Sequence, residues 1–215
     1  MVKAIIFDVD GTLLNTERIY MHSWKIAGKA AGFDISQDTL LRTRAINRAE
    51  AKKIFQDALG TDFDYDAIQK ARTVISEEII AQSDDLLLPG VTEALDALKA
   101  NGYPMAVASS TGREKTVAHL DHAGLLHYFD AVVGGDMVQR GKPNPDIFLK
   151  AAELLGVQPE DCIVVGDTPA DVKAAVAANM PPVLIPDCVT PDETIKAMCH
   201  RVLDSMCQLI SVIEA

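Results

Sequence analysis

The chain has 215 residues, of which 48% are hydrophobic and 24% charged, and its 20 Lys and Arg against 31 Asp and Glu give a net charge of −11. An acidic chain without a basic run is not expected to bind nucleic acid. No run approaches the roughly 18 apolar residues of a membrane span, and the N-terminus lacks the regions of a signal peptide. We therefore expect a cytoplasmic protein that binds neither nucleic acid nor a membrane, and the sequence does not indicate its oligomeric state.

The first predicted element is a buried strand over residues 2–7, and two carboxylates follow it. Asp8 and Asp10 stand two positions apart in I-I-F-D-V-D-G-T-L-L-N-T-E, directly before Gly11. Two like charges on one face of a strand repel each other. We therefore expect the pair to serve a ligand outside the strand.

Residues 16–83 show helical patterns without the alternation of a strand. Helices are predicted around residues 19–31, 49–59 and 65–81. They interrupt a series of alternating strands and helices directly after its first strand. We therefore predict a helical cap over residues 16–85, inserted into a catalytic core that comprises residues 1–15 and 86–215.

From residue 86 onward, strand and helix signals alternate with short spacers, which is the pattern of a parallel sheet covered by helices. Strands are predicted at residues 103–108, 131–133, 162–165 and 183–185, with a short one near Val202. Asn144 and Pro145 are expected as N-cap and first residue of one helix, which Gly156 ends. Another helix is polar, and the histidines on it and its loop are expected in solvent: His119, His122 and His127. The predicted fold class is α/β, a Rossmann-like parallel sheet core with a helical cap inserted after the first strand.

Polar side chains gather at the ends of these strands. Asp8 and Asp10 follow the first strand, Ser109 the second and Asp167 the fourth, while Lys142 precedes the helix that leads to the fourth. Ligands of open parallel sheets bind at the carboxyl ends of the strands, so these groups are expected in one crevice. Carboxylate oxygens suit Mg²⁺, and a magnesium ion beside one lysine would attract a phosphoryl group to an acidic protein. One carboxylate could then attack phosphorus, and another could protonate the leaving oxygen.

Four motifs, in this order, resemble those of the haloacid dehalogenase-like hydrolase superfamily, in the helical-cap subgroup near the β-phosphoglucomutases and small-molecule phosphatases. They are D-V-D-G-T-L-L-N-T-E, V-A-S-S, G-K-P-N-P-D-I-F and V-V-G-D-T-P-A-D. The resemblance covers the whole chain, and Asp10 is similar to the second acid of the phosphate-handling branch. It implies an Mg²⁺-dependent phosphatase that hydrolyses a small phosphomonoester, such as a sugar phosphate, through an aspartyl-phosphate intermediate.

Carried over by position, the resemblance implies a role for each polar residue at the strand ends. Asp8 would be the nucleophile and a metal ligand, and Asp10 the acid and base whose main-chain carbonyl also touches the metal. Ser109 and Lys142 would be catalytic and bind phosphoryl oxygens. Asp167 would complete the metal site.

The resemblance also concerns positions beside this set. Thr168-x-x-Asp171 is a capping-box pattern and also contains the second acid of the family's G-D-x-x-x-D, so Asp171 is a helix cap, a group behind the ligands or a further metal ligand. Gly11 and Ser110 are expected beside the bound substrate. In the cap, Arg48 is the candidate for substrate binding.

Two alternatives stay open at this point. The mutases typically carry a histidine at the position of Tyr20 and a glycine in the cap loop that corresponds to Arg44-Ala-Ile-Asn-Arg48, so hydrolysis is favoured over β-phosphoglucomutase-type phosphotransfer. The alternative of another class is a non-catalytic, phospho-accepting receiver-like domain, because the third predicted strand leads into Asp136.

Overall fold

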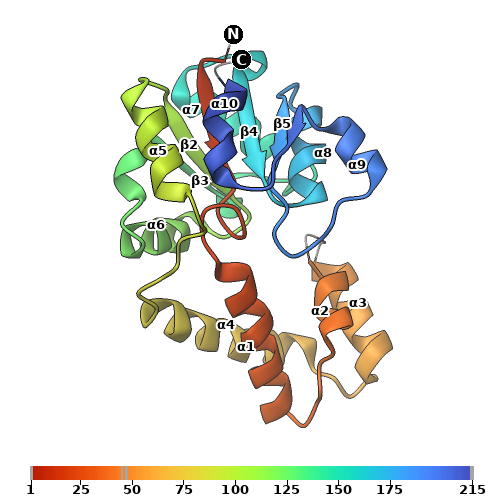
Figure 1. Ribbon diagram of the computed structural model, residues 1–215. Coiled ribbons are helices and arrows are strands. Elements are labelled where there is room, and N and C mark those ends of the chain that lie inside the picture. The colour runs from red at the N-terminus through yellow and green to blue at the C-terminus, as the bar shows by residue number, and fades with distance from the viewer. Residues whose placement is uncertain (1, 45, 47, 214–215) are drawn as a thin grey trace. The chain divides into compact units, whose positions relative to one another are not determined.

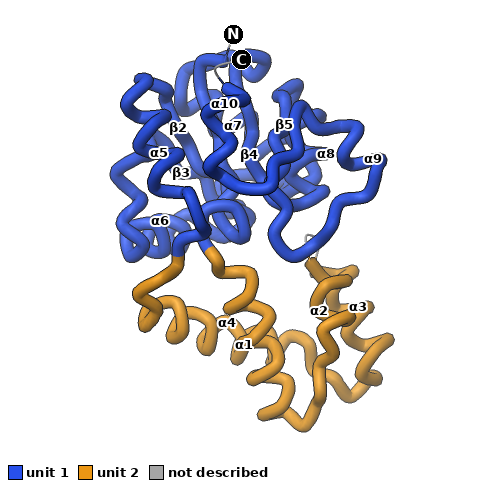
Figure 2. Tube along the Cα trace, viewed as in Figure 1, with its two compact units in different colours: residues 1–14, 87–215 blue, residues 15–86 orange. Residues whose placement is uncertain are grey.

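A computed structural model describes residues 2–44, 46 and 48–213 (Figure 1). The chain divides into two compact units, residues 1–14 with 87–215, which we call the core, and residues 15–86, which we call the cap (Figure 2). Each junction lies one residue from the boundary expected from the sequence. None of the helices among the described residues combines the length and the apolar character that crossing a membrane requires.

The core is built on a six-stranded parallel sheet in which the first strand lies between the second and the fourth. The strand order is β3-β2-β1-β4-β5-β6, and each neighbouring pair is parallel. The strands are β1 (Ala4–Phe7), β2 (Met105–Ser109), β3 (Ala131–Gly134), β4 (Cys162–Gly166), β5 (Pro182–Leu184) and β6 (Arg201–Val202). The predicted α/β fold is confirmed, and its topology brings the carboxyl ends of β1, β2 and β4 together.

Helices cover the sheet because its central strands are apolar on both faces, as in parallel sheets generally. All four residues of β1 are buried. On one face, Ile6 packs in a cluster with Phe148 of α7 and Ala174 of α8. The core helices are α5 (Val91–Ala100), α6 (Arg113–His122), α7 (Asp146–Leu155), α8 (Pro169–Ala177), α9 (Glu193–Met198) and α10 (Leu209–Ile213).

Two local predictions for these helices are wrong. The N-cap residue of α7 is Pro145, because the Asn144 amide donates instead to the Gly141 carbonyl at 3.0 Å and closes the preceding turn. Gly156 ends the helix as predicted, with a φ of +67°. His119 is buried rather than solvated, since α6 turns His119 and Leu120 inward against the core.

The described residues of the cap form four helices around an aromatic centre. The helices are α1 (Thr16–Ala30), α2 (Gln37–Arg42), α3 (Arg48–Leu59) and α4 (Tyr65–Ala81). The Trp24 and Phe55 rings lie 4.5 Å apart, and Phe55 stacks on Phe63 at 5.2 Å. The short α2 is not predicted from the sequence; Ser36 caps it by accepting a hydrogen bond from the Thr39 amide at 3.1 Å. The cap therefore has a hydrophobic core of its own.

The chain passes between the two units twice, and the two passages are hydrogen-bonded to each other. Leu14 and Leu87 form an antiparallel bridge. The Leu88 amide donates to the Leu13 carbonyl at 3.0 Å, and the Asn15 amide donates to the Leu86 carbonyl at 2.8 Å.

Candidate active site

The end of β1 separates the two carboxylates of the first motif. The Asp8 amide still donates to the Val165 carbonyl of β4 at 2.8 Å, so Asp8 continues the sheet. The chain then turns sharply, and the Val9 carbonyl accepts hydrogen bonds from the amides of residues 12–14. Gly11 has a φ of +88°, a conformation that favours glycine over any residue with a Cβ. Asp10 therefore lies beyond the strand.

Three buried carboxylates meet at the carboxyl ends of β1 and β4. Asp8 follows β1, Asp167 follows β4, and Asp171 lies in the first turn of α8. Oxygen atoms of the three lie within 4.8 Å of one another, and the residues are 6%, 3% and 2% exposed. An all-oxygen set of this kind suits a hard cation, so the cluster could hold a metal ion.

Lys142 enters this cluster from the loop before α7. Its Nζ lies 2.5 Å from Asp8 Oδ1 and 2.7 Å from Asp171 Oδ1, and it donates to the Ala108 carbonyl at 2.8 Å. The side chain is 5% exposed. Two of these contacts are hydrogen bonds, to Asp8 and to the Ala108 carbonyl, and the third is an ion pair with Asp171.

The charges of this cluster alter one another's protonation. Burial raises the pKa of the Asp8 carboxyl to about 7, although the neighbouring Lys142 opposes the shift. Burial alone would lower the pKa of Lys142, but the charges of Asp171 and Asp8 outweigh it and raise this pKa. The lysine is therefore charged, and a bound cation would favour the ionised form of Asp8.

Asp171 connects Lys142 to the start of α8. Its Oδ2 accepts hydrogen bonds from the Thr168 amide at 3.0 Å and from the Thr168 hydroxyl at 2.5 Å, so the expected capping box is present. Its Oδ1 faces Lys142. A side chain at Gly166 would collide with Asp171. The helix cap and the lysine thus engage both oxygens of this carboxylate.

Asp10 lies against the loop that follows β2. The Ser109 hydroxyl donates to Asp10 Oδ2 at 3.2 Å, and the Thr111 hydroxyl donates to the same oxygen at 3.2 Å. Ser109 is fully buried, whereas Ser110 is exposed. Thr12, on the β1 loop, donates to Asp167 Oδ1 at 3.5 Å. The contact of Thr111 with Asp10 is not predicted from the sequence, and the only signal for it is the run of hydroxyl residues after β2.

The structure thus brings together four of the predicted residues, Asp8, Lys142, Asp167 and Asp171. It places Ser109 against Asp10, whereas Ser110 is exposed. Comparison with known proteins identifies the family of the chain. Residues 2–179 match a family model described as haloacid dehalogenase-like hydrolase. The chain belongs to this family. The resemblance seen in the four sequence motifs of this hydrolase is thereby confirmed.

Relatives of this hydrolase extend over most of its length. A phosphorylated carbohydrates phosphatase of Thermotoga maritima is 33% identical over 181 residues, which are 83% of this chain and 82% of the relative. The crystal structure of a putative β-phosphoglucomutase from Thermotoga maritima has a TM-score of 0.80 at 27% identity and covers 99% of both chains. The structure of CbbY from Rhodobacter sphaeroides in complex with phosphate has a TM-score of 0.84 at 27% identity and covers 100% of both chains.

The cap of this hydrolase holds the remaining candidate, Arg48. Its guanidinium pairs with Asp66 at 2.7 Å, and its side chain is 62% exposed. Nearby in the sequence, Arg44 pairs with Glu17 at 3.1 Å and is only 7% exposed. Positions 45 and 47 of the cap loop Arg44-Ala-Ile-Asn-Arg48, in which the mutases typically carry a glycine, lie outside the described residues.

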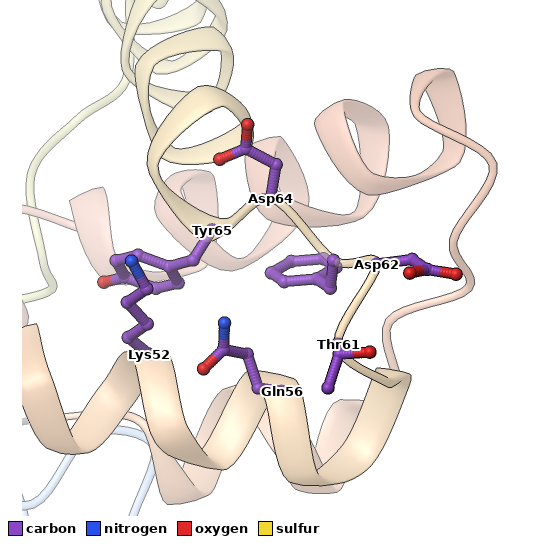
Figure 3. A pocket seen from close by; sticks show the side chains of 7 residues that line it. Lys52, Gln56, Thr61, Asp62, Asp64 and Tyr65 are labelled. Atoms are coloured by element: carbon purple, nitrogen blue, oxygen red, sulfur yellow. The ribbon is translucent and has the colours of Figure 1, made fainter.

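The cap also contains a cavity of about 330 Å³ between the end of α3 and the start of α4 (Figure 3). Two of its polar groups already have structural partners, since Lys52 pairs with Asp66 at 2.8 Å and Asp64 accepts from the Ala67 amide at 3.1 Å. Its lining residues are Lys52, Gln56, Thr61, Asp62, Phe63, Asp64 and Tyr65. In the core cluster, by contrast, buried charges shift one another's pKa values, as is common in active sites.

Proposed function

We propose that this hydrolase releases phosphate from a small phosphomonoester, such as a sugar phosphate, with Mg²⁺ as its cofactor. At the coarser level the predicted class is confirmed: the protein is a phosphatase of the haloacid dehalogenase-like family, in keeping with a phosphatase relative that aligns with 83% of the chain. The substrate, the metal and the residue roles are the proposal.

The observation that carries the proposal is the buried contact of Lys142 with Asp8 beside two further carboxylates. The lysine Nζ lies 2.5 Å from Asp8 Oδ1. In the proposed reaction Lys142 neutralises the phosphoryl oxygens and holds the nucleophile in place. Such electrostatic preorganisation in a water-poor site contributes strongly to rate.

The proposed reaction proceeds in two displacements at phosphorus. A carboxylate oxygen of Asp8 attacks phosphorus, the bond to the alcohol oxygen breaks, and Asp10 gives its proton to that oxygen. Asp10 then takes a proton from water, whose oxygen attacks the phosphorus and releases inorganic phosphate together with the free Asp8 carboxylate. Ser109, at the end of β2, would donate to a phosphoryl oxygen, and Gly11 and Ser110 would border the substrate.

The carboxylate cluster fits the proposed magnesium site. Asp8 and Asp167 would hold the ion together with the main-chain carbonyl of Asp10. The fit is supported by oxygen donors alone within 4.8 Å of one another, the ligand type that Mg²⁺ prefers. Asp171 would act behind these ligands, because Thr168 and Lys142 engage its oxygens. The bound ion would offset the charge of the phosphoryl group.

Hydrolysis is favoured over the two alternatives. Tyr20 stands where the mutases typically have the histidine that supports the switch between the two orientations of the sugar phosphate. Its ring lies 4.1 Å from the Arg72 guanidinium. The receiver-like alternative required Asp136 as phospho-acceptor. The side chain of Asp136 instead accepts a hydrogen bond from the Arg113 amide at 2.8 Å, and the family match supports an enzyme.

Two further expectations belong to this proposal. Arg48 is proposed to contact the substrate from the cap, which its 62% exposed side chain permits. We also propose a cytoplasmic location, where phosphorylated metabolites would be the partners of the protein.

A panel of sugar phosphates tests the proposed function. Phosphate release should require Mg²⁺, should be undetectable in Asp8→Asn, and should fall by roughly 10² to 10⁴ in Asp10→Asn, the usual contribution of a general acid and base. The panel includes β-glucose 1-phosphate, and glucose 6-phosphate is measured in that reaction. Formation of glucose 6-phosphate would show phosphotransfer. Full activity of Asp8→Asn would exclude the mechanism.

A further inference from the structure

Two hydroxyl groups of one loop donate to a single oxygen of Asp10. The Ser109 and Thr111 hydroxyls each lie 3.2 Å from Asp10 Oδ2. Ser109 lies at the very end of β2, while Thr111 lies two residues further along. The resemblance and the proposed function use Ser109 but assign nothing to Thr111.

We infer that Thr111 is a positioning residue that holds Asp10 for proton transfer, an inference that rests on the proposed function. A hydroxyl has one proton to donate. If Ser109 donates to a phosphoryl oxygen of the substrate, it no longer donates to Asp10. Thr111 then keeps Asp10 Oδ2 in place while the phosphoryl group is bound.

The surroundings of Thr111 suit this role because its backbone is fixed on both sides. The Thr111 amide donates to Ser109 Oγ at 3.0 Å. Its carbonyl accepts from the Gly135 amide at 3.0 Å. A threonine on a fixed backbone has few χ1 rotamers, so its hydroxyl points to Asp10 at small entropic cost.

Gly135 allows the loop after β3 to approach this close. A side chain at this position would collide with the Ser110 carbonyl oxygen. Beside it, Asp136 Oδ1 accepts from the Arg113 amide at 2.8 Å, one residue after Gly112. The loop after β3 thus braces the loop that carries Thr111, and both belong to the core.

If Thr111 positions Asp10, the loss of rate on removing Thr111 should depend on the leaving group of the substrate. Asp10 donates its proton to an alcohol that leaves poorly without it, whereas p-nitrophenolate leaves without protonation. Loss of Thr111 should therefore slow the cleavage of an alkyl phosphate far more than that of p-nitrophenyl phosphate. The parameter kcat/KM isolates this step, since it reports events up to departure of the leaving group.

The experiment compares Thr111→Val, Thr111→Ser and the control Thr116→Val, using the best sugar phosphate of the panel and p-nitrophenyl phosphate. Thr116→Val removes a hydroxyl that touches the same loop but not Asp10. In Thr111→Val, kcat/KM for the sugar phosphate should fall about 10- to 100-fold, as expected for a lost hydrogen bond to a charged group. For p-nitrophenyl phosphate the fall should be less than about threefold, and Thr111→Ser should restore most of the sugar phosphate activity.

Each outcome decides the inference. Equal losses for both substrates, an unimpaired Thr111→Val, or an equal loss in Thr116→Val would overturn it, because the effect would then be absent or due to packing. If Thr111→Val does not fold, the deciding comparison is Thr111→Ser against Thr111→Ala. Thr111→Ser should keep wild-type activity, and Thr111→Ala should lose it. A wild-type protein that hydrolyses neither substrate would overturn the proposed function itself, a result distinct from all of these.

Discussion

The core and the cap use the same kinds of charged residue in opposite ways. In the core, Lys142 lies between Asp8 and Asp171, and all three side chains are at most 8% exposed. In the cap, Asp66 lies between Arg48 and Lys52, and these side chains are 42% to 62% exposed. The ion pairs of a lysine or arginine with carboxylates are therefore buried in the core and exposed to water in the cap.

The difference shows what burial does to an ion pair. Burial dominates at Asp8 and raises its pKa to about 7. At Asp66, hydrogen bonds from Lys52 and Arg48 lower the pKa to about 2. The core charges are held ready for a ligand at a cost in stability, whereas exposed pairs contribute little because water screens them.

The largest expected effect comes from removing the lysine of the core. Lys142→Met should destabilise the metal-free protein by about 3–5 kcal/mol at pH 8, the usual cost of leaving buried charges without their partner. The loss should shrink as the pH falls, because the remaining carboxylates then take up protons instead of staying charged. Urea unfolding in the presence of a chelator measures it.

Lys52→Met is the matched control, since it removes a lysine that also pairs with a carboxylate but lies 42% exposed. The Lys52→Met variant should unfold at nearly the same urea concentration as the wild type, both at pH 8 and at lower pH. Similar losses in the two variants would contradict the contrast between core and cap.

An intermediate effect is expected for metal binding. With the pKa of Asp8 at about 7, a cation that needs its carboxylate competes with a proton below that pH. The affinity for Mg²⁺ should therefore rise about tenfold from pH 6 to pH 8, with protons released on binding. Isothermal titration calorimetry measures both quantities, and the same affinity at the two pH values would show that Asp8 is not a ligand or not protonated.

The smallest effect is expected from the cap. Because the folded-state pKa of Asp66 is lowered to about 2, its ion pairs stabilise the protein above about pH 4 and this contribution is lost as the pH falls toward 2. Asp66→Asn should lower the Tm by at most about 2 °C at pH 6 and by less at pH 3. A larger change, or one that persists in about 1 M salt, would mean that the pair is not screened.

The sequence predicts which core residues lie together because a simple geometric rule governs their placement. Residues at the carboxyl ends of neighbouring parallel strands must meet, so recognising the strands before Asp8, Ser109 and Asp167 is enough to bring these side chains together. Lys142 is harder to place by this rule, since it follows no strand. Its assignment depends on the family resemblance.

Other features depend on contacts that no local pattern encodes. The hydrogen bond from Thr111 to Asp10 joins residues that are 101 positions apart, and its existence depends on how the loop after β3 braces the loop after β2. The burial of His119 similarly depends on which side of a weakly amphipathic helix meets the core. In the cap, Arg48 is the candidate for substrate binding from the sequence, and no local pattern predicts its pairing with Asp66 of another helix.

The antiparallel bridge between Leu14 and Leu87 affects how freely the segment between them can vary in length. The chain leaves the core at Leu14 and returns beside it at Leu87. Backbone hydrogen bonds of the core therefore join these two positions, whatever segment lies between them. A segment joined in this way adds little loop-closure entropy to the folding of its host as its length changes. The length of the helical insertion can therefore change at little cost to the folding of the core.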